Sequence, residues 1–291
     1  MKKLMIAGAL CASAATTMPA YAQAADGCTV IGSIPATIGA PGNYCMGANA
    51  TVEMNSGAAI SIEADNVTLD CRNFTLTNEA TSNTGKSIGI SAVSRYNLLV
   101  RNCRLVGGFT DAISLTQPMA AGNTTFYNRI ENNYILGPYR YGIVANGSAV
   151  EVRNNTVYDV GGQATGVAMG IRLGAAAQSG ARFQVVEDNL VAGVTSIANT
   201  GYGIYSSASI GSIFRRNTVT GTVGALPGYL SFGIRIASGS GNNVRDNHVV
   251  GRGRSNERGI QLPTDGGACF HNFIGVSQTP VSGCNTDHGN Y

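Results

Sequence analysis

One six-residue phrase recurs along most of this chain and restricts what the chain can fold into. In its clearest form it is Val152-Arg153-Asn154-Asn155-Thr156-Val157, with apolar residues at both ends and an asparagine in the fourth position. Eight copies begin 22 to 34 residues apart, from a variant at Leu69 to a degenerate one at Cys269. A unit of about 20 to 35 residues that repeats with strand-like alternation is typical of a solenoid.

A second phrase follows the same period. A glycine or alanine followed by an apolar residue opens a run of alternating apolar and polar residues in each turn of the chain. The phrase begins at Gly89, Ala112, Gly142, Gly170, Gly203, Gly233 and Gly259. Each turn therefore carries at least two short strands at fixed relative positions. This is the organisation of a parallel β-helix, whose rungs stack at about 4.8 Å.

The first 24 residues have the pattern of a secretory signal peptide. A basic start over residues 1–3 precedes an apolar run over 4–15, and small residues within 20–24 suit cleavage. No later apolar stretch is long enough to span a bilayer. We therefore expect an exported protein, periplasmic or extracellular, that does not insert into a membrane.

The remaining residues have a composition suited to strands and tight turns. Without the expected signal peptide the chain carries 17 basic and 16 acidic residues, so net charge does not favour nucleic acid or an anionic membrane as a partner. The full sequence is rich in glycine, with 39 residues, and contains no tryptophan. We expect one all-β domain with about eight to nine rungs over 59–274, an N-terminal cap over 25–58 and a C-terminal cap over 275–291.

The start of the repeats resembles a known family. The stretch Asp65–Leu76, which reads DNVTLDCRNFTL, looks like the first rung of secreted right-handed parallel β-helix repeat proteins of the pectate-lyase-like superfamily. The segment from Cys28 to Cys45 is similar to the lead-in of many bacterial members. The resemblance covers essentially the whole chain after the signal peptide and implies a right-handed parallel β-helix. It is weak for function, because the superfamily contains lyases, hydrolases, epimerases and adhesins.

Six cysteines remain after the signal peptide, and an even number in an exported protein favours disulfides. The pairing that closes the shortest loops, one at each end of the solenoid, is Cys28–Cys45 with Cys269–Cys284. Cys71 and Cys103 fall one position apart in the alignment of the repeats. They are either buried thiols or a bridge between rungs.

The asparagine column is expected to be structural. It comprises Asn133, Asn155, Asn189, Asn217, Asn247 and Asn272. An asparagine tolerates the unusual dihedrals of a tight bend, and amides stacked at the rung spacing can hydrogen-bond to one another. Just before the bend in each rung lies a charged residue, and its sign alternates over six rungs: Asp70, Arg101, Glu131, Arg153, Glu187 and Arg215, with Arg245 following. We expect a ladder of ion pairs there and no metal site.

The strand that begins with the second phrase is called the Gly-Ile strand. Its outward-facing positions are the candidate ligand-binding positions. The candidates are Arg172, Tyr205, Arg235 and Gln261, with Tyr141 and Tyr202 nearby. A guanidinium can hold a uronate carboxylate in a bidentate fashion, and aromatic rings stack on the faces of sugars. The pattern predicts polysaccharide, or another extended ligand, as the partner. The resemblance adds that carbohydrate-active members bind polymer along this type of face.

No catalytic residue can be assigned from the sequence. A lyase needs a base and neutralisation of the uronate carboxylate, commonly by calcium on clustered carboxylates, but Asp111, Asp159 and Asp265 are isolated in the sequence. We therefore expect a binding protein without a cofactor rather than an enzyme. Two alternatives remain open. One is a polysaccharide lyase with a site based on Arg172 or Arg235, for which calcium is a possible cofactor, and the other is a structural or surface interaction module.

Overall fold

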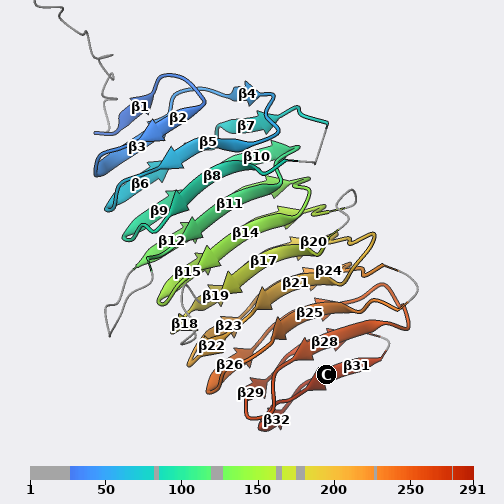
Figure 1. Cartoon of the computed structure of the whole chain (residues 1–291). Coiled ribbons are helices and arrows are strands. Elements are labelled where there is room, and N and C mark those ends of the chain that lie inside the picture. The colour runs from blue at the N-terminus through green and yellow to red at the C-terminus, as the bar shows by residue number, and fades with distance from the viewer. Residues whose placement is uncertain are drawn as a thin grey trace, which may run out of the picture.

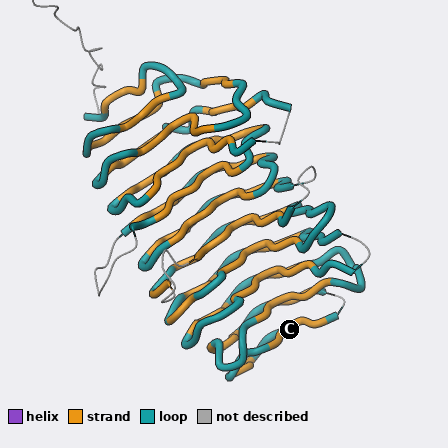
Figure 2. The backbone as a smooth tube through the Cα atoms, in the orientation of Figure 1, coloured by secondary structure: helices purple, strands orange, loops and turns teal. Residues whose placement is uncertain are grey.

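The computed structural model describes residues 27–81, 85–118, 127–161, 166–174, 181–225, 228–276 and 278–291. Among these residues all regular secondary structure is β-strand, and 32 strands are present (Figure 2). No helix in the described part of the chain is long and apolar enough to cross a membrane. The expected signal peptide, residues 1–24, lies outside the described residues.

The strands form three long sheets and one short one. Sheet A consists of β1 (Thr29–Ile31), β3 (Gly42–Met46), β6 (Val67–Asp70), β9 (Leu98–Arg101), β12 (Asn128–Glu131), β15 (Val150–Arg153), β19 (Val185–Glu187), β23 (Ile213–Arg215), β26 (Asn242–Arg245), β29 (Gly267–Phe270) and β32 (Thr286–His288). Sheet C consists of β4 (Ala50–Val52), β7 (Thr75–Asn78), β10 (Arg104–Gly107), β13 (Tyr134–Leu136), β16 (Thr156–Tyr158), β20 (Leu190–Ala192), β24 (Thr218–Thr220), β27 (His248–Val250) and β30 (Phe273–Gly275). Sheet B consists of β2 (Ala36–Ile38), β5 (Gly57–Ile62), β8 (Ser87–Val93), β11 (Asp111–Thr116), β14 (Tyr141–Asn146), β17 (Ala168–Gly174), β21 (Gly201–Ser206), β25 (Ser231–Ile236), β28 (Glu257–Gln261) and β31 (Thr279–Ser282). The short sheet pairs β18 (Ala181–Arg182) with β22 (Ser209–Ile210).

The chain visits sheets A, C and B in turn and then begins the next rung, so every strand pairs in parallel with its equivalent one turn away. The rungs follow one another from the blue N-terminal end to the red C-terminal end of the solenoid (Figure 1). The fold is a right-handed parallel β-helix of about eight turns with three main sheets, as predicted.

The two terminal segments expected as caps belong to the solenoid itself. At the N-terminal end β2 pairs with β5 and β3 pairs with β6. At the other end β31 pairs with β28, and β32 pairs with β29. The repeat phrase is absent from both segments, but short strands remain. A parallel rung requires only this backbone pairing: β2 buries Ile38, whereas the paired β31 has no fully buried residue.

Apolar side chains stack in columns along the interior. In sheet B one column consists of isoleucine in eight successive strands, all fully buried: Ile60, Ile90, Ile113, Ile143, Ile171, Ile204, Ile234 and Ile260. The residue before each of the last six is glycine or, in β11, alanine. At Gly203 an added Cβ would lie 2.2 Å from Val219 Cγ1 and 2.7 Å from the Gly233 carbonyl oxygen. The glycines therefore allow the close approach of sheet C to sheet B.

The asparagine column forms a continuous ladder inside the solenoid. Asn189, which is 2% exposed, shows the pattern. Its Oδ1 accepts from the backbone N–H and the Nδ2 of Asn155, both at 3.0 Å, and its own Nδ2 donates to Asn217 Oδ1 at 2.9 Å. Each of the six asparagines repeats the bond to the next rung. The last acceptor is Asn290, a member of the ladder that the repeat phrase did not include.

The described part of the chain contains three disulfides. Cys28–Cys45 and Cys269–Cys284 join the cysteines that the sequence paired. Cys71 and Cys103, which the sequence left as either buried thiols or a bridge, form a disulfide between neighbouring rungs, with Cα atoms 4.6 Å apart. Disulfides persist in oxidising compartments, which is consistent with an exported protein.

The expected ion pairs form in part. Asp70 pairs with Arg101 at 2.9 Å, and Glu187 pairs with both Arg153 and Arg215. Elsewhere the pairing departs from simple alternation, because additional charges lie beside the column: Glu131 with Arg129, Glu151 with Arg129 and Arg153, and Asp188 with Arg216. The result is a network that links neighbouring rungs along sheet A.

We predict that Arg216→Ala makes the protein more sensitive to acid. Hydrogen bonds from Arg216, both at 2.7 Å, lower the pKa of Asp188 below its ordinary value. A folded-state pKa below the unfolded value of about 3.9 stabilises the protein above that pH, and this stability is lost as pH falls through the folded pKa. Without Arg216, the midpoint of acid unfolding followed by circular dichroism should move to higher pH by a few tenths of a unit. Arg104→Ala should leave it unchanged, because Arg104 contacts a tyrosine ring. Equal midpoints for both variants would contradict the prediction.

Candidate ligand-binding face

The predicted binding residues lie on the outer face of sheet B. Arg172 in β17 is in register with Tyr205 in β21, Tyr205 with Arg235 in β25, and Arg235 with Gln261 in β28. These four side chains therefore form one column that runs along the solenoid at the strand spacing of about 4.8 Å. All four are half-buried, so each is partly exposed to solvent.

A second column runs beside the first and was largely missed by the sequence analysis. Its members are in register across the same strands: Asp111, Tyr141, Met169, Tyr202, Phe232 and Arg258. Each precedes the glycine or alanine of the Gly-Ile phrase by one position. The position immediately before the glycine or alanine is therefore a sequence signal by which Phe232 and Arg258 could have been assigned to this column. We call the two columns together the Arg/Tyr face.

The aromatic residues of this face form a hydrophobic cluster separate from the interior. Met169, Tyr202 and Phe232 are buried, and Tyr141 and Tyr205 pack against them. The rings of Tyr202 and Phe232 stack with centroids 5.3 Å apart, and the Tyr205 ring lies 4.8 Å from that of Tyr202. Tyr202 is only 9% exposed, so it supports its neighbours, whereas the half-buried Tyr141 and Tyr205 retain accessible ring surface.

Aromatic rings hold the arginines of the face. The guanidinium carbon of Arg235 lies 4.7 Å from the centre of the Phe232 ring, and its Nη1 donates a hydrogen bond of 3.1 Å to the Tyr202 hydroxyl. The guanidinium carbon of Arg172 lies 5.7 Å from the Tyr141 ring. Such contacts restrict the orientation of the guanidinium plane while leaving N–H groups to bind an anion.

One carboxylate lies on this face between β11 and β28, and it is already paired. Arg140 donates to both oxygens of Asp111, at 3.1 and 2.9 Å, and Arg140 also lies over the Tyr141 ring at 4.4 Å. Burial alone would lower the pKa of Arg140, but its hydrogen bonds to Asp111 raise it above the ordinary value. Asp111 therefore has an arginine partner, which the sequence did not indicate. The pairing depends on the register of strands 29 residues apart and leaves no separate signal in the sequence.

The outer face consequently presents an excess of positive charge. Arg172, Arg235 and Arg258 have no carboxylate within ion-pair distance among the described residues. The described part of the chain holds no group of three or more His, Cys, Asp or Glu side chains placed to bind a metal ion. What the arrangement offers chemically is recognition of carboxylate or sulfate groups by oriented guanidinium groups, with tyrosine rings beside them.

The chain is similar to several solved structures at low sequence identity. XylC, solved in complex with xylose, is 14% identical with a TM-score of 0.46, over 76% of this chain and 38% of XylC, so the chain spans well under half of that protein. The A-module of the mannuronan C-5 epimerase AlgE6 from Azotobacter vinelandii is 15% identical with a TM-score of 0.42, over 85% of this chain and 80% of the module. The Dettilon tailspike protein is also 15% identical with a TM-score of 0.42, over 87% of this chain and 59% of the tailspike.

These similarities concern the fold. No curated protein matches the chain. The sequence model described as the right handed beta helix region matches residues 24–179, which is more than half of the chain. The phrase repeats, the parallel sheets and this match lead to one conclusion: the chain belongs to the family of right-handed β-helix proteins.

Proposed function

We propose that this is an exported protein that binds an anionic polysaccharide along its Arg/Tyr face. The observation that carries the proposal is that Arg172 and Arg235 lie over aromatic rings and have no carboxylate partner among the described residues. Arg140, by contrast, is paired with Asp111 on the same face.

The arrangement of the charges supports an extended ligand. Arg172 and Arg235 belong to one column and are two rungs apart, which corresponds to about 10 Å. Tyr205 lies between them and offers part of its ring. A polymer lying along the solenoid could place one acidic group on each arginine and a sugar ring on the tyrosine between them. The three disulfides and the expected signal peptide support export.

The test is retention of the purified protein on immobilised acidic and neutral polysaccharides, with and without calcium. We expect retention on acidic polymers, and we expect Arg172→Ala and Arg235→Ala each to weaken binding by about ten- to a hundredfold, because each removes charge-assisted hydrogen bonds worth about 1.5–3 kcal/mol. Arg104→Ala is the matched control, since Arg104 also lies over a tyrosine ring, Tyr134 at 4.5 Å, but on sheet C.

The same assay should follow the ultraviolet absorbance of new unsaturated sugar ends. Absorbance that disappears in Arg172→Ala or Arg235→Ala would replace the binding function with that of a polysaccharide lyase. Equal retention of all three variants would place the ligand away from the Arg/Tyr face. Absence of both signals across the panel would favour a structural or surface interaction module.

A further inference from the structure

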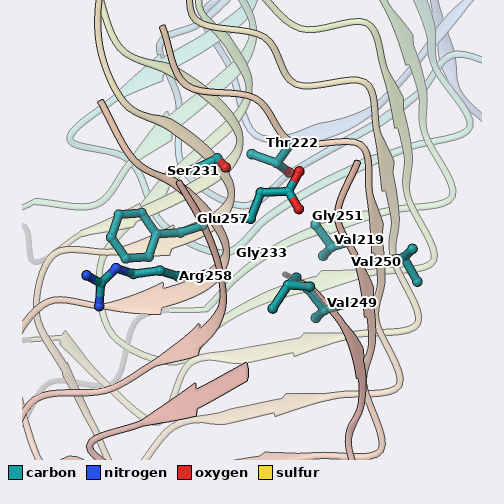
Figure 3. Close-up of a pocket in the computed structure, with 11 residues that line it drawn as sticks. Val219, Thr222, Ser231, Gly233, Val249, Val250, Gly251, Glu257 and Arg258 are labelled. Carbon is teal, nitrogen blue, oxygen red and sulfur yellow. The ribbon is translucent and has the colours of Figure 1, made fainter. Parts of the chain in front are cut away.

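A small cavity lies where the chain passes from sheet C to sheet B near the C-terminal end of the solenoid. Figure 3 shows the side chains of Thr222, Ser231 and Glu257 close together around it, with the apolar Val219 and Val249 on its other side. The cavity measures about 10 Å³. This is close to the smallest space that holds one water molecule.

Two hydroxyl groups at this cavity have no hydrogen-bond partner. Thr222 is 6% exposed and Ser231 is 2% exposed, and neither Thr222 Oγ1 nor Ser231 Oγ is paired. A buried hydroxyl without a partner costs about 1–3 kcal/mol, so two unpaired hydroxyls beside the same cavity require an explanation. Neither hydroxyl reaches a carboxylate oxygen of Glu257 directly.

Glu257 is the third polar group at the cavity. Its carboxylate is buried, with the residue 2% exposed, and it accepts backbone N–H bonds from Arg252 at 2.5 Å and Gly253 at 3.0 Å. A carboxylate offers about four acceptor positions, so further hydrogen bonds can be accepted. Glycine at position 251 leaves room for the Glu257 carboxylate, because a Cβ on Gly251 would lie 2.1 Å from Glu257 Oε2.

We infer that one water molecule occupies this cavity and joins the Glu257 carboxylate to the hydroxyls of Thr222 and Ser231. Water can donate to the carboxylate and accept from both hydroxyls, which satisfies all three groups at once. A cation is a less suitable occupant of the cavity than water. The carboxylate already accepts from two N–H groups, and the positive ends of these groups would repel a cation.

The water connects two consecutive turns. Thr222 and Ser231 belong to one turn, and Glu257 begins the strand of the next, in register with Ser231. The following residues of the two strands, Phe232 and Arg258, belong to the Arg/Tyr face on the outside. The water therefore fixes the spacing of β25 and β28 behind that face, and this role is independent of whether the face binds polysaccharide.

Thermal unfolding distinguishes a hydrated cavity from a dry one. The matched control is Ser206→Ala, because Ser206 is fully buried with an unpaired hydroxyl but does not line this cavity. Removing an unpaired hydroxyl should leave the Tm unchanged or raise it. Ser231→Ala and Thr222→Val each remove a partner of the water and should lower the Tm by about 2–4 °C. If both variants behave like Ser206→Ala, the cavity is dry and the inference is wrong.

A crystal structure of the chain grown in a thallous salt, with thallium as a heavy mimic of potassium, tests the identity of the occupant. Density without anomalous signal, about 2.7–3.1 Å from Glu257, Thr222 and Ser231 oxygens, is expected. An anomalous peak at that point would show a monovalent cation and overturn the inference. Absence of density in a well-ordered cavity would overturn it as well.

Discussion

Asn189→Ala should lower the free energy of unfolding by about 3–5 kcal/mol. The side chain is buried and accepts two hydrogen bonds from Asn155, while its Nδ2 donates to the carbonyl oxygen of Val152 and to Asn217 Oδ1. Alanine leaves the backbone N–H of Asn155 without an acceptor in the interior, removes one acceptor of the Asn155 amide and removes the donor to the Val152 carbonyl oxygen. Each buried group left unmet costs about 1–3 kcal/mol. Urea unfolding followed by circular dichroism measures the loss.

The control is an asparagine pair that resembles the ladder but is exposed. Asn97 Nδ2 donates to Asn66 Oδ1 at 3.0 Å on the surface. Asn97→Ala exposes its partner to water, so we expect a loss below about 1 kcal/mol after allowing for the left-handed backbone of residue 97. A loss of that small size at Asn189 would show that water enters the ladder and replaces the amide.

Gly203→Ala is the second substitution with a large expected effect. Its Cβ would lie 2.2 Å from Val219 Cγ1 and 2.7 Å from the carbonyl oxygen of Gly233 in the next rung. The Val219 methyl group lies in a packed interior and has little room to move. The Gly233 carbonyl group can move only if β21 and β25 separate. We expect a loss of about 2–3 kcal/mol, which the same urea experiment measures.

A glycine with free space around it provides the comparison. Gly39 has no atom within 4 Å of an added Cβ and does not have a left-handed backbone. Gly39→Ala should be neutral or stabilising by up to about 1 kcal/mol, because alanine restricts the unfolded chain. If Gly203→Ala is equally harmless, the glycines do not permit a close contact, and their role at the start of the sheet B strands must be sought elsewhere.

The fold could be predicted because its determinants repeat locally. The isoleucine column and the asparagine column each recur once per turn, so one sequence contains many independent copies of the same signal.

The disulfide between Cys71 and Cys103 could not be predicted from the repeats. Arg72 and Asn73 are both left-handed, with φ of 52° and 63°, whereas the next corner has a single left-handed residue at Asn102. This difference places Cys71 against Cys103 although the repeat alignment offsets them.

The candidate site was predictable in its outward column but not in its packing. Alternation along the strand is enough to place Arg172, Tyr205 and Arg235 outside. The stacking of Tyr202 on Phe232 and the pairing of Arg140 with Asp111 depend on which residues of different turns become neighbours. The loops between turns vary in length, so that register is a property of the folded solenoid.

The asparagine ladder gives the solenoid a direction. From Asn133 to Asn272 every amide donates one hydrogen bond to the next asparagine and accepts from the preceding rung, so the carbonyl dipoles of the ladder point the same way. The amide nitrogen also donates to a carbonyl oxygen of the preceding rung. A rung left at a C-terminal edge therefore loses the acceptors of its backbone N–H and of one amide N–H, whereas a rung left at an N-terminal edge loses the acceptor of one amide N–H only. Unpaired N–H groups are tolerated less well than unpaired carbonyls. Loss of turns from the C-terminal end should thus be the more damaging truncation.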